Sequence, residues 1–155
     1  MAQTVEQRLT NMGVSLPKPA APAANYVPFV TAGKLIFVAG QITILDGKLQ
    51  YLGKVGDTLS TEDGYKAARI CAINLIAQVK KACSGDLERV TQVVKLGGFV
   101  NCTPNFTEQP KVINGASDLI AEVFGENGKH ARIAVGVPSL PLDVAVEVDG
   151  IFEIA

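Results

Sequence analysis

Apolar residues follow two different periods along this chain, and the periods predict an ordered series of helices and strands. Helical spacing marks residues 2–12, the long segment from Ser60 to Gly85, and residues 108–124. Short β-rich runs occupy residues 26–31, 34–39, 42–45, 49–52, 90–102, 131–136 and 144–153. Because a β-then-helix passage occurs twice, we expect an α+β domain with two main helices on one face of a mixed sheet.

Local signals set several boundaries of these elements. Ser60 is followed by acidic residues, a pattern like a capping box at a helix start. Gly33 predicts a hairpin turn, and Asp46-Gly47 predicts a second tight turn. The adjacent glycines at positions 97 and 98 predict a bulge or a close backbone approach within the 90–102 strand.

The N-terminal residues differ in composition from the rest of the chain. Residues 2–12 can form an amphipathic helix with Val5, Leu9 and Met12 on one side. Residues 16–22 are rich in proline, which lacks an N–H donor and disfavours helix, so an extended linker is expected there. We therefore predict an N-terminal helix and linker over residues 1–23 and a single main domain over residues 24–155.

Composition narrows the classes of function. Of 155 residues, 48% are apolar and 19% charged, with a mean hydropathy of +0.26, which predicts a large core and some apolar surface buried between subunits. The net charge is −1 and basic residues are scattered, so nucleic-acid binding is not expected. No apolar run is long enough for a membrane span, and the N-terminus lacks a secretory signal. Three cysteines without metal-site spacing favour reduced thiols in the cytoplasm.

Arg132 and Glu147 form the most informative pair of charges, because each lies within an apolar, strand-like segment. A guanidinium in such a segment is costly without a carboxylate, and arginine can grip a carboxylate at two points. If the intervening Pro-rich segment turns between Ser139 and Leu140, Arg132 faces Glu147 across an antiparallel pair of strands. The residues alone leave two interpretations open: a structural ion pair, or a site for a ligand's carboxylate.

Several other residues are candidates for a site. His130 is the only histidine, which argues against a zinc site or a catalytic triad and favours a surface residue at a strand start. Cys102 is expected to pack as a small apolar side chain, whereas Asn101 and Thr103 offer polar groups that a small ligand could use. Tyr26 is either a pocket wall or a core residue. No glycine spacing fits a phosphate-binding loop, so no nucleotide cofactor is expected.

The segment from Ala131 to Val148, ARIAVGVPSLPLDVAVEV, resembles the signature of the Rid/YjgF family, the reactive intermediate deaminases also named L-PSP endoribonucleases. Every part of the signature occurs here in order: Ala-Arg, a few apolar residues, Leu-Pro, a short spacer with Asp, and an apolar-Glu-apolar step. Residues 33–41 also resemble the hairpin of this family. The anchor sequence Arg132-Ile-Ala, the N-terminal region and the loop at residues 101–105 indicate a longer, divergent subgroup.

The resemblance implies a chorismate-mutase-like fold, a homotrimer with clefts between subunits, and hydrolysis of 2-imino or 2-enamino acids to 2-keto acids. It implies that Arg132 anchors the substrate carboxylate and that Glu147 orients water or Arg132. It further implies that Tyr26 and Gly40 line the cleft. Because an imine is already activated, a positioned water suffices, and no metal or cofactor is expected.

The sequence is also compatible with two alternative functions. One is a non-catalytic trimer that binds small carboxylate metabolites through the same arginine. The other is an RNA-cleaving or translation-inhibiting protein, which ranks last because the sequence contains no cluster of basic residues that would form a surface for RNA.

Overall fold

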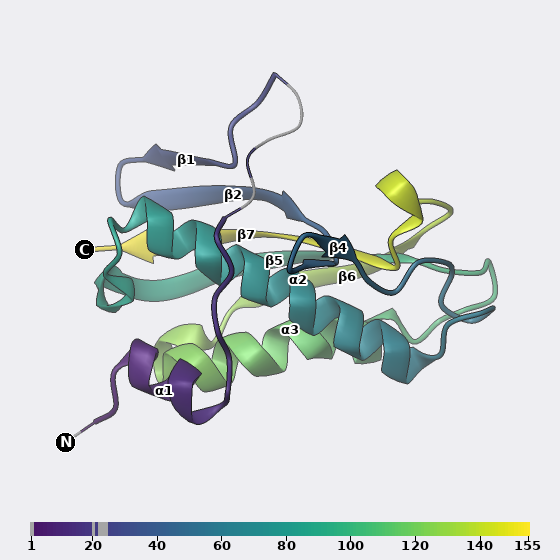
Figure 1. Ribbon diagram of the computed structural model, residues 1–155, viewed down its shortest axis with the longest axis horizontal. Coiled ribbons are helices and arrows are strands. Elements are labelled where there is room, and N and C mark those ends of the chain that lie inside the picture. Colours follow the sequence, from purple (N-terminus) through teal and green to yellow (C-terminus); the bar gives the residue numbers. More distant parts are fainter. Residues whose placement is uncertain (1, 20, 22–24) are drawn as a thin grey trace.

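The computed structural model describes residues 2–19, 21 and 25–155, and within them the chain forms a mixed five-stranded sheet in the order β1-β2-β7-β5-β6. The strands span Phe29–Ala32 (β1), Leu35–Gln41 (β2), Val90–Asn101 (β5), Ala131–Val137 (β6) and Val146–Ile154 (β7). Helices α2 (Thr61–Ala82) and α3 (Gln109–Phe124) lie on the same face of this sheet (Figure 1). The α+β fold with a mixed sheet is confirmed.

The helix boundaries follow the predicted capping signals. Ser60 is the N-cap of α2, and Ser60 and Asp63 form a reciprocal capping box. Helix α3 has proline within its first turn and ends at Gly125, where φ is 62°. Short 3-10 helices follow at Leu87–Arg89 (η1), Gly125–Gly128 (η2) and Pro141–Asp143 (η3).

Both predicted hairpins are present. Strands β1 and β2 pair through the turn at Gly33, and a small separate hairpin joins β3 (Ile44–Leu45) to β4 (Lys48–Leu49). Asp46 and Gly47 both have positive φ, 52° and 76°, as a two-residue primed turn requires. The turn chemistry was therefore sufficient to place these two reversals.

The predicted antiparallel pairing of the last two strands is wrong. Strand β5 lies between them: β6 pairs with β5 in parallel, whereas β7 pairs with β5 on its other edge in antiparallel fashion. The Pro-rich segment is a crossover rather than a tight turn. It is held by hydrogen bonds from Gly53 N–H to Asp143 O (2.8 Å) and from Asn101 N–H to Ala145 O (2.8 Å).

The glycine pair in β5 permits close packing of α3. A Cβ on Gly98 would lie 2.6 Å from side-chain atoms of Ile113, so only glycine lets the helix approach this far. The irregular register of β5 falls elsewhere, between Val90 and Gln92 and between Val93 and Lys95. Of the two expectations for the glycines, close approach is confirmed.

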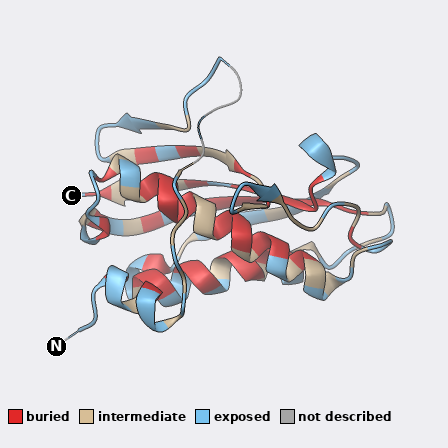
Figure 2. Ribbon diagram, in the orientation of Figure 1, coloured by how far each residue is buried: buried red, intermediate tan, exposed pale blue. Residues whose placement is uncertain are grey.

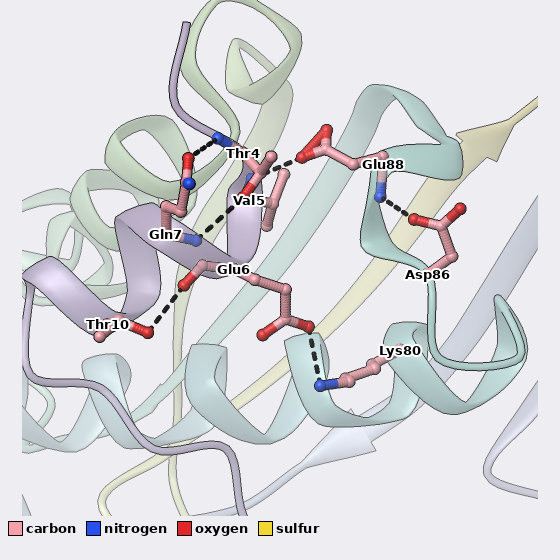
Figure 3. A network of polar contacts seen from close by, with 8 residues as sticks. All are labelled: Thr4, Val5, Glu6, Gln7, Thr10, Lys80, Asp86 and Glu88. Carbon is pink, nitrogen blue, oxygen red and sulfur yellow. Dashed lines mark hydrogen bonds and ion pairs between the residues drawn. The ribbon is translucent and has the colours of Figure 1, made fainter.

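Helix α1 (Val5–Asn11) packs against the rest of the chain. Val5 and Leu9 belong to the buried cluster that also contains the inner faces of α2, α3 and the sheet (Figure 2). Polar contacts surround them: Glu6 pairs with Lys80 at 2.7 Å, and Glu88 accepts from Val5 N–H at 2.6 Å (Figure 3). Residues 20 and 22–24 of the predicted linker lie outside the described residues, and the boundary at residue 24 stays a prediction.

Candidate active site

Arg132 points from β6 towards α3 and is surrounded by neutral acceptors. Its Nη1 donates to Asn114 Oδ1 (2.8 Å) and to Ser117 Oγ (3.0 Å), and its Nη2 donates to Pro110 O (3.2 Å). Positions 110, 114 and 117 follow the helical period, so one face of α3 supplies all three acceptors. The guanidinium is therefore held along the helix while it stays half-buried.

This arrangement leaves part of the guanidinium open. A guanidinium has five N–H groups, and three are engaged by the acceptors just named. The Nε–H and one Nη2–H have no acceptor within the part of the chain that the structure describes, and no carboxylate there pairs with Arg132. Two adjacent N–H groups with an uncompensated positive charge match a carboxylate ligand in geometry and in charge.

A cavity of about 420 Å³ adjoins this cluster at the ends of β5 and β6. Gln109, which lines the cavity, directly precedes Pro110, whose carbonyl binds Arg132. The wall also includes Thr103, a predicted site residue, and it is mostly apolar: Cys102, Pro104, Phe106, Val137 and Pro138. The volume is in the range typical of sites for small molecules.

Glycine at position 136 keeps this cavity open on the sheet side. A Cβ there would lie 2.7 Å from Cys102 Sγ and 2.8 Å from Gln109 Nε2. Gly136 is on the same face of β6 as Arg132, since the two positions are an even number of residues apart. The cavity and the open guanidinium therefore lie along one side of one strand.

Asn101 is fully buried, and its side chain is occupied. Its Nδ2 donates to backbone oxygens of Gly53 and Val144, and its Oδ1 accepts from Lys54 Nζ at 2.9 Å. Lys54 also donates to Pro138 O and lines the cavity. Asn101 thus fixes the strand ends and Lys54, and a contact between Asn101 and a ligand stays a prediction.

Glu147 lies on the opposite face of the sheet from Arg132. Arg132 is in register with Leu96, which is buried under the helices, whereas Glu147 is in register with Phe99, three residues further along β5. Paired residues share a face and successive residues alternate, so the two charges project to opposite sides. The expected contact between them within one subunit is therefore absent, and the reason is the insertion of β5 between their strands.

The Glu147 carboxylate packs directly on Gly40, because a Cβ at position 40 would overlap its Oε2. Burial raises the pKa of the Glu147 carboxyl, and the nearby charge of Asp149 raises it further. No ion pair compensates Glu147 among the described residues. A half-buried carboxyl with a raised pKa is a candidate for proton exchange in a site.

Tyr26 is 53% exposed and precedes β1. Its segment runs beside the end of β2, where Ala39 N–H donates to Pro28 O at 2.9 Å. Gly40 is thus in contact with Glu147, and the segment of Tyr26 runs beside the same end of β2. Arg132 and Glu147 project to opposite faces of the sheet, and Gly40 lies with Glu147.

The partners of Arg132 were not predicted from the sequence. Asn114 and Ser117 were absent from the candidate list, as were Lys54 and Gln109. Polar residues at helical spacing within an apolar segment, 114 and 117, were the available signal. Among the described residues, no cluster of three metal-binding side chains is present and no helix is long and apolar enough to span a membrane.

The sheet order, the two helices on one face and the arginine beside α3 define an α+β protein of the chorismate-mutase-like type. The sequence profile described as "YjgF/chorismate mutase-like, putative endoribonuclease" matches residues 6–153, and the chain belongs to this family.

Similar proteins extend over nearly the whole chain. Protein TCP17 of Trypanosoma cruzi is 49% identical over 151 residues, covering 97% of this chain and 94% of that protein. The structure of Atu1372 from Agrobacterium tumefaciens, a protein of unknown function, has a TM-score of 0.92 at 48% identity and covers 97% of this chain and 92% of that one. A Shewanella oneidensis structure, also named a "putative endoribonuclease", has a TM-score of 0.95 at 39% identity, with coverage of 98% and 100%.

Proposed function

We propose that this protein hydrolyses small 2-imino or 2-enamino acids to 2-keto acids and ammonium, in a cleft formed between subunits of a cytoplasmic homotrimer. The observation that carries the proposal is the open half of the Arg132 guanidinium. Three neutral acceptors orient it, and two N–H groups remain for a carboxylate. A substrate carboxylate would supply the missing negative charge.

The reaction needs little beyond orientation. Water adds to the C=N carbon, a proton passes from this water to nitrogen, and collapse of the tetrahedral adduct leaves a C=O bond and releases ammonia, which takes a proton from solvent to become ammonium. Arg132 holds the carboxylate beside the reacting carbon, which converts the encounter with water into a local step. Glu147, with its raised pKa, orients the water and accepts and returns the proton.

An assembly is required if Arg132 and Glu147 serve one site. The two side chains project from opposite faces of the sheet, so Glu147 would come from a neighbouring copy. The face that carries Glu147 is apolar and lacks a helical cover: Phe37, Ile133 and Val135 are 42%, 43% and 41% exposed. Apolar area of this kind favours association with further copies, and the family resemblance indicates three.

The cavity next to Arg132 suggests where the substrate side chain lies. Its mostly apolar wall would receive an aliphatic or aromatic side chain, while the carboxylate stays on the guanidinium. Thr103 and Gln109 add polar groups at the cavity wall. We therefore expect substrates larger than the imine of alanine to be accepted.

An imine-hydrolysis assay tests the proposal. An amino-acid oxidase generates imino acids in situ, and keto-acid release is followed for wild type, for Arg132→Ala and for Arg89→Ala. Arg89 is a matched control, since it is also half-buried and donates to a backbone oxygen, that of Ala155, at 3.3 Å. Acceleration that only Arg132→Ala abolishes would support the deaminase. Keto-acid binding without acceleration would instead favour the non-catalytic binder, and salt-sensitive RNA cleavage would favour the ribonuclease.

A further inference from the structure

A chain of three hydrogen bonds connects the backbone to Arg132. His130 Nδ1 lies 2.7 Å from Gly128 O, and His130 Nε2 lies 2.8 Å from Ser117 Oγ. The same Ser117 oxygen lies 3.0 Å from Arg132 Nη1. The only histidine of the sequence is thus engaged through both ring nitrogens, next to the arginine.

The chemistry of these groups fixes the direction of the bonds. A carbonyl oxygen only accepts, so the proton must be on Nδ1 of His130. In the neutral imidazole, Nε2 then carries a lone pair. Ser117 then donates its hydroxyl proton to Nε2, and its oxygen lone pairs are directed towards the Nη1–H of Arg132.

The backbone carbonyl at which this series of hydrogen bonds begins, that of Gly128, is held rigidly. Gly128 is buried in η2, and a Cβ there would lie 2.6 Å from Ile120 O, so the segment is packed directly on the α3 backbone. Ser117 and Asn114 come from the same helix. Every group that accepts a hydrogen bond from Nη1 of Arg132 is therefore part of α3, and this rigid support keeps the guanidinium in one orientation.

We propose that Ser117 and His130 are positioning residues that hold Arg132 with its Nε–H and one Nη2–H turned towards the ligand. This inference rests on the proposed carboxylate site. Without the hydrogen bonds through Ser117 and His130, the guanidinium keeps its bonds to Asn114 and Pro110 but is less tightly oriented. Part of its two-point binding of the ligand's carboxylate is then lost. Neither residue contacts the ligand, so the effect is on ligand affinity and KM, and not on kcat with bound substrate.

Replacements separate this role from packing. Ser117→Ala removes the bridging oxygen, and His130→Phe keeps a planar ring but removes the acceptor. His130→Gln offers an amide oxygen near the place of Nε2 and should rescue binding. The loss of one such hydrogen bond corresponds to an affinity about fivefold weaker for 2-oxobutanoate in the first two variants.

The test combines calorimetric titration of 2-oxobutanoate with nitrogen-15 NMR of the intact assembly. Because the chain has a single histidine, its ring signals need no assignment. We expect the Nδ1–H tautomer, a change in the ring signals on binding, weaker binding by Ser117→Ala and His130→Phe, and near-normal binding by His130→Gln. Circular dichroism checks that each variant is folded.

The outcomes distinguish a failure of the positioning role from a failure of the carboxylate site itself. Wild-type affinity in Ser117→Ala and His130→Phe, with binding lost in Arg132→Ala, would overturn the positioning role and leave the anchor intact. An Nε2–H tautomer would also overturn it. Failure of the wild type to bind any keto acid would overturn both, since an oriented guanidinium that takes no carboxylate is not an anchor.

Discussion

The separation of Arg132 and Glu147 on opposite faces of one sheet makes a strong prediction about mixed assemblies. Arg132→Ala removes the proposed carboxylate anchor, and Glu147→Gln removes the proposed proton-exchanging group. Each variant alone should be inactive in imine hydrolysis. If a site takes Arg132 from one subunit and Glu147 from its neighbour, a mixture of the two variants contains some sites in which both residues are intact.

The size of the recovery follows from the geometry. In a three-subunit ring that contains both variants, one of the three sites joins an intact arginine to an intact glutamate, so about one third of wild-type activity returns. If both residues served a site within one subunit, every site would lack one of them, and the recovery would be zero. The register of β5 with β6 and β7 excludes that second arrangement for direct contact.

The assay uses two differently tagged variants expressed together and purified by both tags in sequence. Mixed wild type and Arg132→Ala assemblies serve as the control and should retain about half of the activity, since each site needs one arginine. Mixed assemblies that form normally but show no more activity than either parent would refute the composite site. Full purification of each parent alone sets the background.

Three further predictions follow from single residues. Since burial raises the folded-state pKa of Glu147, the contribution of this group to stability is full below the unfolded pKa of about 4.3 and is lost as pH rises through the folded pKa. The Tm of Glu147→Gln minus that of wild type should therefore rise with pH, and a difference that falls with pH would contradict this. Leu9→Ala should cost about 2–4 kcal/mol in urea unfolding because Leu9 is 2% exposed, whereas Leu52→Ala, at 47% exposed, should cost little; equal losses would show that α1 is not part of the core. Cys102, which lines the cavity, should react with maleimide before the other two buried thiols, Cys71 and Cys83, and a large keto acid should slow it; simultaneous labelling would count against an accessible cavity.

Local signals in the sequence were enough to predict the elements that frame the site. Ser60 forms its capping box, and Gly33 and Asp46-Gly47 form their turns, because each of these depends on the conformation of a few adjacent residues. Arg132 could also be selected from the sequence as a candidate, since a fixed charge within an apolar strand must be explained by a partner or a ligand.

The pairing of strands could not be derived in the same way. The two-residue period of a strand shows which of its residues share a face, but it does not show which strand lies beside it. The consecutive strands β6 and β7 were therefore paired, although β5 lies between them. Asn101 shows a related limit, because an exposed ligand-binding amide and a buried structural amide have the same sequence pattern. The complete burial of Asn101 and its bonds to Gly53, Val144 and Lys54 are visible only in the structure.

The charges that the fold leaves unpaired connect ligand binding with assembly. Among the described residues, neither Arg132 nor Glu147 has an ion-pair partner, and both are half-buried. If they paired within one subunit, the guanidinium would be closed to a ligand; the insertion of β5 prevents this. The cost of two uncompensated charges can be lowered by a neighbouring copy or a bound carboxylate, and for Glu147 also by protonation, which its raised pKa favours. If a cleft between copies holds the ligand, the linkage is reciprocal: a bound keto acid stabilises the assembly by the same free energy by which assembly strengthens its binding.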